Sequence, residues 1–349
     1  MRDDTSASRD LSEFELIDLF SERAPDPERI RIGIGDDAAV VATRGAVVTS
    51  VDTAVEGVHF RREWSTPEQI AGKAVGAALS DLAAMGAGST GIEIYIGLGV
   101  RRGTSQDFLR GLAKGAGEVA SRHGATLAGG DTVSSPVLFL AVTVVSHIDD
   151  PDSVVPRSGA LPGDAVAVTG TLGGARAGLW LLEDPGLPLS PELPAAVRRA
   201  LIARQLEAHP RFAAGSTLAA SGARAMVDVS DGLVADLGHI ARASGPDGGV
   251  AVRIDAGRIP SGPGVESVAL AAGLDRFEPA LSGGEDYELA VAISPDRVEA
   301  ATGALERDGV SLTVIGEVLE PGGDTPAGVS IEFEGKPIGL DSTGFDHFA

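Results

Sequence analysis

The sequence contains no cysteine and few aromatic residues among its 349 positions. The absence of cysteine excludes disulfide bonds, thiolate metal sites and cysteine nucleophiles. Aromatic residues make up 4% of the chain and hydrophobic residues 43%, so a globular core must consist mainly of aliphatic side chains. Glycine is abundant, with 47 residues, which predicts frequent sharp turns.

The sequence also lacks any long apolar run. No stretch approaches the roughly 18 uninterrupted apolar residues of a membrane-spanning helix. The first ten residues do not show the charged-then-apolar pattern of a secretory signal. We therefore expect a soluble, cytoplasmic protein that does not associate with membranes.

Basic residues are scarce relative to acidic ones. The chain has 28 Lys and Arg against 50 Asp and Glu, a net charge of −22. This charge opposes binding to nucleic acids or anionic membrane surfaces. It would also repel nucleotides and other phosphate esters, unless divalent cations lay between carboxylates and phosphate oxygens.

Length and hydrophobic periodicity predict two α+β domains, because a chain of 349 residues exceeds what one core usually supports. We place the domains at 1–150 and 151–349, joined through the Pro- and Gly-rich segment 149–164. In the first domain the patterns predict helices over 11–20, 68–86 and 105–123 and strands over 45–52, 91–100 and 137–148. In the second they predict strands over 165–169, 225–229, 250–254, 287–293, 312–319 and 329–333, and a helix with Leu233, Leu237 and Ile240 on one face.

Nine carboxylates occur in short, mostly glycine-flanked segments where apolar runs stop. The segments are G-I-G-D-D (33–37), S-V-D-T (50–53), S-D-L-A-A-M-G (80–86), G-G-D-T (129–132), D-V-S-D-G-L (228–233) and S-G-G-E-D-Y (282–287). Aspartates beside glycines at such junctions suit hard metal ions near phosphates. The hypothesis requires that these segments converge in the folded chain.

Each segment alone also has a structural explanation. Asp36 and Asp37 fit a solvated turn as well as a metal site. Asp52 is expected to close a strand, with Ser50 on the same face of that strand. His59 is more typical of a partly buried histidine with one satisfied ring nitrogen than of a metal ligand.

The remaining segments also fit either a structural role or a metal or phosphate site. Asp81 lies in an apolar helix and needs a partner, a proton or a metal, and Lys73 is roughly 12 Å away along the helix. Asp131 follows two glycines that suit either a turn or a close approach to phosphate. In D-V-S-D-G, Ser230 or Asp231 fits a helix N-cap or an anion site. Glu285 and Asp286 fit a solvated turn.

The ordered set of motifs resembles the thiamine-monophosphate kinase family. The resemblance covers about residues 31–348 and includes S-V-D-T-x-V-E-G-x-H-F, L-S-D-L-A-A-M-G-A, G-G-D-T, R-S-G-A-x-P-G-D, D-V-S-D-G-L-x-x-D-L-x-H-I, S-G-G-E-D-Y-E-L and a closing G-F-D-H-F. It implies the two-domain fold of aminoimidazole ribonucleotide synthetase, in which N-terminal α+β domains form a dimeric, barrel-like core and a C-terminal α+β domain completes the active-site cleft. It also implies phosphorylation of thiamine monophosphate by ATP, with several Mg²⁺ ions, in a homodimer.

The resemblance implies roles for individual residues. The positions that match Mg²⁺ ligands of the family are Asp37, Ser50, Val51 (through its backbone carbonyl), Asp52, Asp81, Asp131, Asp228 and Asp231. Positions that match nucleotide contacts are Gly130, Asp131, Arg157 and Ser230, and those that match thiamine contacts are His59, Glu285 and Phe345. Asp81, Asp131 and Arg157 are the residues that we expect to be catalytic.

Two departures from the family pattern bear on substrate binding. The region that often carries an aromatic residue for the nucleotide reads L-A-K-G (112–115), so the adenine contact is not located. The first aromatic residue of the closing G-F-D-H-F is Phe345 where relatives carry Tyr or Trp, which preserves stacking and loses a polar contact. We expect direct in-line transfer, since phosphoryl transfer depends mainly on positioning and charge neutralisation.

Alternative functions are other ATP-dependent enzymes of this superfamily and a binding protein without activity. Selenophosphate synthetase needs a reactive Cys or selenocysteine, and the hydrogenase-maturation relative acts on a partner's C-terminal Cys. Aminoimidazole ribonucleotide synthetase lacks the S-V-D-T, G-V-H-F and F-D-H-F combination. A non-catalytic Mg-nucleotide-binding dimer would have no need of so many converging ligands.

Overall fold

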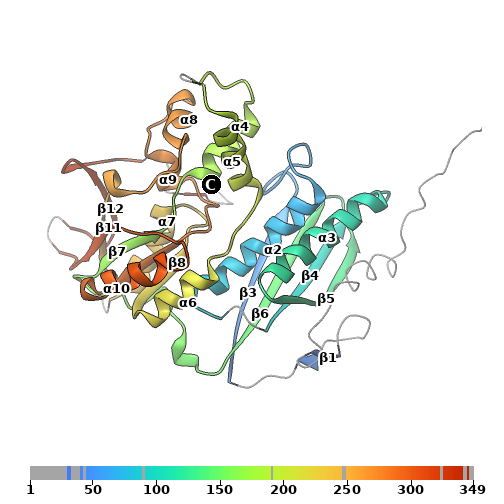
Figure 1. Cartoon of the computed structure of the whole chain (residues 1–349), viewed down its shortest axis with the longest axis horizontal. Helices are drawn as coiled ribbons and strands as arrows, with labels where there is room; N and C mark the ends of the chain where they lie inside the picture. The colour runs from blue at the N-terminus through green and yellow to red at the C-terminus, as the bar shows by residue number, and fades with distance from the viewer. Residues whose placement is uncertain are drawn as a thin grey trace, which may run out of the picture. The chain divides into compact units, whose positions relative to one another are not determined.

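The computed structural model describes residues 45–88, 91–189, 192–245, 249–322, 325–340 and 344–345, and the backbone of two short strands, β1 (Ile30–Ile32) and β2 (Val40–Val41). The chain divides into two compact units (Figure 1). Unit 1 comprises Met1–Leu79 and Ser89–Asp150, and unit 2 comprises Ser80–Gly88 and Pro151–Ala349. The helix predicted over 11–20 lies outside the described residues.

Unit 1 contains a four-stranded sheet in the order β3-β6-β4-β5. Its strands are β3 (Ala46–Val55), β4 (Ile92–Val100), β5 (Ala125–Ser134) and β6 (Phe139–Ile148). The β4–β5 pair is parallel and the other two pairs are antiparallel. Alternation in β4 buries Ile92, Ile94, Ile96 and Leu98, as the period-two pattern predicts.

Two helices cover one face of this sheet, α2 (Pro67–Ala84) and α3 (Gln106–Arg122) (Figure 1). The side chain of Ser105 caps α3 by accepting a hydrogen bond from the Phe108 N–H. The helices approach closely at Gly115, where a Cβ atom would lie 2.0 Å from the Glu68 carbonyl oxygen. Helix α2 begins in unit 1, and its last turns belong to unit 2.

Unit 2 is built on a seven-stranded sheet in the order β13-β12-β9-β11-β7-β10-β8. Its strands are β7 (Ala165–Thr169), β8 (Ala223–Asp228), β9 (Ala251–Asp255), β10 (Leu289–Ile293), β11 (Leu312–Leu319), β12 (Gly328–Phe333) and β13 (Lys336–Pro337). Every residue of β7 and β10 is buried, which places them at the centre of the core. The β9–β12 pair is parallel and the other pairs are antiparallel.

Helices cover both faces of the unit 2 sheet. They are α4 (Gly174–Glu183), α5 (Ala195–Leu206), α6 (Phe212–Ala220), α7 (Leu233–Ala243), α8 (Val265–Ala271), α9 (Glu278–Ser282) and α10 (Pro295–Glu306), with 3-10 turns at Pro151–Ser153 and Ala256–Arg258. Val166 and Val168 of β7 share a cluster with α7, whereas Ala167 packs with α6 and α10. The sheet is therefore buried on two sides, which accounts for its continuous apolar strands.

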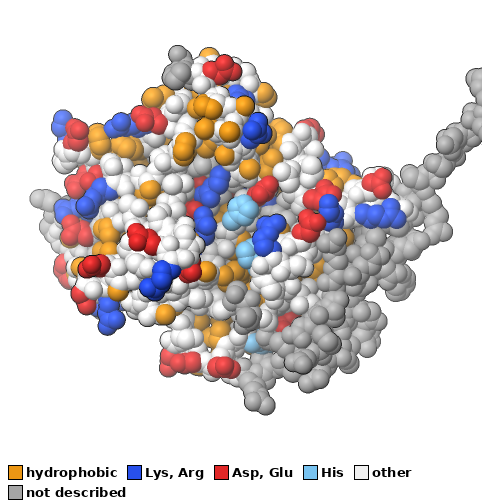
Figure 2. Space-filling model, in the orientation of Figure 1, with side chains coloured by type: hydrophobic (Ala, Val, Ile, Leu, Met, Phe, Trp, Pro, Cys, Tyr) orange, Lys and Arg blue, Asp and Glu red, His pale blue; other side chains and the backbone are white. Residues whose placement is uncertain are grey.

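A third apolar cluster joins α4, α5 and α8. Figure 2 shows apolar side chains gathered where Figure 1 draws α4 and α5. Leu181 and Leu201 are buried in this cluster, and Trp180 packs against it while partly exposed. The cluster fixes α5 against α4. Helix α5 carries two residues, Arg204 and Gln205, that contact the G-G-E-D-Y segment, so this packing also fixes their positions.

Several predictions of secondary structure are confirmed, and the predictions for Asp52 and for the G-G-D segment are wrong. Strands 165–169 and 312–319 coincide with β7 and β11, and Leu233, Leu237 and Ile240 lie in the core as predicted. Strand β3 does not end at Asp52 but continues to Val55, because β6 pairs with it over all ten residues. The G-G-D segment is not a turn but part of β5, paired in parallel with β4. Within the described residues, no helix is long and apolar enough to span a membrane.

Candidate functional site

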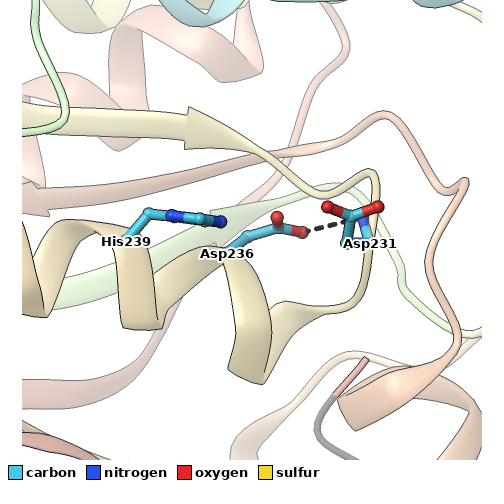
Figure 3. Close-up of side chains that lie close together, drawn as sticks. All are labelled: Asp231, Asp236 and His239. Atoms are coloured by element: carbon cyan, nitrogen blue, oxygen red, sulfur yellow. Dashed lines mark hydrogen bonds between the residues drawn. The ribbon is translucent and has the colours of Figure 1, made fainter. Parts of the chain in front are cut away.

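The D-V-S-D-G segment forms a tight turn between β8 and α7 in unit 2. Strand β8 ends at Asp228, and Gly232, with a φ of 131°, precedes the first residue of α7. A carboxylate oxygen of Asp236 accepts hydrogen bonds from the N–H groups of Ser230, Asp231 and Gly232, at 3.0, 3.2 and 3.1 Å. Figure 3 shows the bond from Asp231. The expectation that Ser230 or Asp231 caps this helix is wrong. Asp236 reaches back from the first turn of α7 and satisfies the N–H groups instead.

Carboxylates crowd around this turn. The pKa of Asp236 is raised to about 8, first by burial and then by the nearby charges of Asp228 and Asp231, against the lowering effect of hydrogen bonds from Gly232 and Ser230. Asp236 and Asp228 are both 2% exposed. Asp228 and Asp231 therefore both lie within electrostatic reach of Asp236.

His239 lies one turn further along α7 and faces Asp236 (Figure 3). Ligand atoms of Asp231, Asp236 and His239 lie within 4.8 Å of one another. The Arg242 guanidinium lies 3.0 Å from Nδ1 of His239 and can only donate, so Nδ1 accepts and the ring proton is on Nε2. Burial of the ring lowers the pKa of His239, and the positive charges of Arg157 and Arg242 lower it further. Arg157, an exposed residue, is thus close to the acidic turn.

Three other segments of unit 2 meet the D-V-S-D-G turn through hydrogen bonds. Ser80, near the end of α2, donates its hydroxyl hydrogen to Asp228 Oδ2 over 2.6 Å. The Glu285 N–H donates to the Ser230 carbonyl over 2.8 Å. The Phe345 N–H donates to the Asp231 carbonyl over 2.9 Å. Four of the sequence segments therefore converge within unit 2, including the closing G-F.

The G-G-E-D-Y segment enters β10 in an unusual backbone conformation. Glu285 and Tyr287 have φ values of 56° and 50°, which non-glycine residues rarely adopt. The Tyr287 N–H donates to the Val229 carbonyl over 3.0 Å, which fixes the segment against the acidic turn. Strained residues of this kind concentrate at functional sites.

Asp286 is not the solvated turn residue that the sequence suggested. It is 5% exposed and accepts hydrogen bonds from the N–H groups of Gly173 and Ala175 at the start of α4, at 2.6 and 3.1 Å. Burial raises the pKa of Asp286 to about 6, against the lowering effect of the Arg204 guanidinium and these N–H groups. Asp286 lies between Glu285 and Tyr287, the two residues of this segment with positive φ values.

Glu288 anchors the other end of the same segment. This residue is 1% exposed and accepts a hydrogen bond from the Thr169 hydroxyl over 2.8 Å. Arg211 binds it through two guanidinium nitrogens, and Arg204 bridges it to Asp286. The buried negative charges are thus matched by two arginines from α5 and the start of α6.

Five of the unit 1 candidates lie on the two edge strands of its sheet. Ser50, Val51 and Asp52 are on β3, whereas Gly130 and Asp131 are on β5. One row of paired residues runs from Thr53 through β6 and β4 to Asp131, so three strand spacings, about 14 Å, separate the two edges. The sheet of one chain therefore does not bring Asp52 and Asp131 together.

The other predicted residues are placed as follows. His59 follows β3 and accepts a hydrogen bond from the Val55 N–H at Nδ1 over 3.1 Å, which confirms that one ring nitrogen is satisfied by the backbone. Asp81 is half-buried near the end of α2. Phe345 is 54% exposed. Asp36 and Asp37 lie outside the described residues.

Sequence reasoning assigned no role to Ser80, Gln205, Asp236 or His239. Two signals were available, because Asp236 and His239 are part of D-L-x-H in the recognised motif and Ser80 directly precedes Asp81. Gln205 had no local signal. Its contact with Glu285 spans 80 positions of the sequence.

Comparisons with known proteins agree with this arrangement. The family described as AIR synthase related protein, N-terminal domain, matches residues 35–148, and the corresponding C-terminal domain family matches residues 162–327. The thiamine-monophosphate kinase of Mycobacterium tuberculosis (strain CDC 1551 / Oshkosh) is 39% identical over 287 residues, which cover 80% of each chain.

Two solved structures are also similar to this chain in fold and sequence. The thiamine-monophosphate kinase of Stenotrophomonas maltophilia K279a has a TM-score of 0.79 and 35% identity, over 95% of this chain and 99% of that one. The structure of AaThiL complexed with AMPPCP and TMP has a TM-score of 0.72 and 30% identity, over 97% of both chains. The sequence motifs, the two-domain α+β fold and these similarities agree: the chain belongs to the thiamine-monophosphate kinase family.

Proposed function

We propose that this protein phosphorylates thiamine monophosphate with ATP to give thiamine diphosphate and ADP. The observation that carries the proposal is that two further acidic segments, S-D-L-A-A-M-G and S-G-G-E-D-Y, meet the D-V-S-D-G turn of unit 2, in a chain that belongs to this family. The relative crystallised with AMPPCP, an analogue of ATP, and TMP supports the choice of both substrates.

The donor set fits Mg²⁺. Asp228 and Asp231 supply hard carboxylate oxygens. Burial raises the pKa of the neighbouring Asp236, and the negative charges of Asp228 and Asp231 add to this rise, so a cation bound to these two carboxylates would offset charge that the turn concentrates. Imidazole nitrogen is a poor Mg²⁺ ligand, so His239 is left out of the proposed set. The proposed ligands are Asp37, Ser50, the Val51 carbonyl, Asp52, Asp81, Asp131, Asp228 and Asp231. Bound Mg²⁺ would neutralise phosphate charge during the transfer.

The protein's own residues would hold the phosphates in line. Gly130 and Ser230 are proposed to contact the nucleotide, Gly130 because it lacks a side chain that would block close approach of the backbone. Arg157 is exposed and close enough to the acidic turn to affect His239, so its guanidinium could neutralise charge on the ATP phosphates. Asp81 and Asp131 complete the set of residues proposed to be catalytic.

The transfer is proposed to be direct, without a phosphorylated residue. A phosphate oxygen of thiamine monophosphate is already ionised near neutral pH, so it can attack the γ-phosphorus without a strong general base. His59, Glu285 and Phe345 are proposed to contact the thiamine substrate. Transfer of chiral γ-thiophosphate should give inversion of configuration, whereas net retention would indicate a covalent phosphoenzyme.

Assembly and location remain proposals too. We propose a homodimer, with residues 1–150 as the ATP-, Mg²⁺- and dimer-forming domain and residues 151–349 supplying the remaining ligands and substrate contacts. The wide separation of Asp52 and Asp131 in one sheet supports this assembly, since a single chain does not join its two edges. We propose a cytoplasmic enzyme, in keeping with a chain that contains no cysteine.

The decisive test is ATP turnover measured with and without thiamine monophosphate in the presence of Mg²⁺. We expect ADP and thiamine diphosphate to form in equal amounts, and no ADP to form above background without the acceptor. Binding of ATP without acceptor-dependent turnover would instead support a non-catalytic binding protein and contradict the proposal.

A further inference from the structure

Helix α5 presents two adjacent residues, Arg204 and Gln205, to the G-G-E-D-Y segment. The amide nitrogen of Gln205 donates to Glu285 Oε2 over 2.6 Å. Arg204 donates to the Asp286 carbonyl over 3.2 Å and to Glu288 Oε1 over 3.4 Å. One helix therefore holds three nearby acidic residues, each through a specific contact.

The position of Gln205 is itself fixed by close packing. The residue is 6% exposed. A Cβ atom on Gly178 of α4 would lie 2.1 Å from the Leu201 carbonyl and 3.1 Å from the Gln205 Cβ, so the two helices meet without space for a larger residue. The amide is thus placed by the rigid α4–α5 pair and not by a loop.

The backbone of Glu285 is fixed as well. Its φ of 56° and the hydrogen bond from its N–H to the Ser230 carbonyl set the direction in which its side chain leaves the chain. The remaining freedom lies in the side-chain torsions, and the contact with Gln205 restricts them. A short hydrogen bond to a carboxylate is among the stronger neutral-to-charged contacts in proteins.

The groups that donate hydrogen bonds to Glu285, Asp286 and Glu288 differ in charge. Asp286 and Glu288 contact the cationic Arg204, whereas the Gln205 amide orients Glu285 without adding a positive charge of its own. A carboxylate held in this way suits a cationic ligand, and the thiazolium ring of thiamine is cationic. Orientation by an amide keeps that electrostatic attraction, which an arginine at the same position would weaken.

We propose that Gln205 is a positioning residue for substrate specificity, which acts by holding the Glu285 carboxylate toward the cationic part of thiamine monophosphate. This inference rests on the proposed function, in which Glu285 contacts the thiamine substrate. Gln205 itself touches no reacting atom, so its effect should appear in the binding of one substrate only.

Steady-state kinetics of Gln205→Leu provide the test. We expect the KM for thiamine monophosphate to rise about tenfold, the effect of losing about 1.4 kcal/mol, while the KM for ATP and kcat stay within about twofold. Arg199→Ala, on an exposed position of the same helix, is the matched control and should leave all three constants unchanged. Gln205→Glu, which is nearly isosteric, should raise the same KM further by placing two carboxylates together, and it serves if the Leu variant fails to fold.

A double-substitution cycle separates positioning from a general structural role. Glu285→Gln alone should raise the KM for thiamine monophosphate, and adding Gln205→Leu to it should cause no further rise. Additive effects, or a parallel rise in the KM for ATP, would overturn the inference. So would a normal KM in Gln205→Leu when Glu285→Gln raises it, although the proposed function would then stand. If the unsubstituted protein shows no acceptor-dependent turnover, the proposed function itself fails.

Discussion

Ser80 donates its hydroxyl hydrogen to Asp228 over 2.6 Å, although 148 positions of sequence separate the two residues. Ser80 is fully buried and Asp228 is 2% exposed, so water does not replace this contact easily. The hydrogen bond joins the end of α2 to the last residue of β8, and it places the segment that contains Asp81 beside the D-V-S-D-G turn. A side chain that the motif analysis passed over therefore connects two of its candidate segments.

Loss of this hydroxyl should weaken the site. In Ser80→Ala a buried carboxylate oxygen loses a charge-assisted hydrogen bond, worth about 1.5–3 kcal/mol. We expect the Mg²⁺ concentration for half-maximal turnover to rise by about tenfold or more, because Asp228 is no longer held in place. Ser221→Ala is the control, since the Ser221 hydroxyl donates a hydrogen bond to the Thr217 carbonyl within its own helix end. An unchanged Mg²⁺ dependence in Ser80→Ala would contradict this role.

Removing the charge of proposed metal ligands should abolish activity without unfolding the chain. We expect Asp81→Asn and Asp131→Asn each to lower kcat by at least about a hundredfold, because each substitution removes a hard anionic ligand while keeping the shape of the side chain. Far-ultraviolet circular dichroism and melting temperature should remain close to those of the unsubstituted chain. Asp107→Asn, at a side chain 98% exposed, should have normal activity. Near-normal turnover in both site variants would end the metal-ligand assignment.

Asp236 should matter through its acceptor oxygen more than through its charge. Asp236→Asn retains an oxygen that can accept the three turn N–H groups, whereas Asp236→Ala leaves them unsatisfied in a buried position. We expect the Ala variant to lose about 2–4 kcal/mol of unfolding free energy and the Asn variant to stay near the unsubstituted value. Urea denaturation measures both. Equal destabilisation of the two variants would show that the negative charge itself is required.

The pH dependence of stability should report on Asp286. Its pKa in the folded chain is raised from 3.8 to about 6, so the folded state binds a proton there more tightly than the unfolded state does. The contribution of Asp286 to the unfolding free energy should therefore fall, by up to about 3 kcal/mol, as pH rises from about 4 to about 6, and this contribution should not change above that range.

The variant Asp286→Asn removes this titration and provides the comparison. Its unfolding free energy should lack the part of the decline that belongs to Asp286, so the difference between the two chains should change between pH 4 and 6. Asp308→Asn, at an exposed carboxylate, should follow the unsubstituted chain throughout. Parallel curves for Asp286→Asn and the unsubstituted chain would mean that burial does not raise this pKa.

Local patterns predicted the secondary structure best where burial alternates or is continuous. Strands β7 and β11 lie where apolar runs predicted them, because hydrophobic period depends on neighbouring residues alone. The end of β3 and the state of the G-G-D segment were predicted wrongly. Each depends on pairing with another strand. Strand β6 pairs with β3 beyond Asp52, and β4 pairs with the residues that include Asp131.

For the acidic segments too, the sequence predicts the kind of chemistry, whereas the positions of the side chains depend on tertiary contacts. The absence of cysteine already excludes thiolate ligands, and the acidic composition with a net charge of −22 favours carboxylate ligands and bridging cations. Whether Asp286 is a turn residue or a buried anchor could not be read from G-G-E-D-Y, because its partners come from α4 and α5.

The sequence by itself determined the family, the two α+β domains and the kinds of ligand atoms, since these follow from residue types, their order and local periodicity. Only the tertiary structure decided which side chains meet. Ser80 with Asp228, Gln205 with Glu285 and Asp236 with the turn before α7 are contacts that strand pairing and helix packing create. The physical reason is that a hydrogen bond requires atoms about 3 Å apart, and for residues far apart in sequence only the folded core sets that distance.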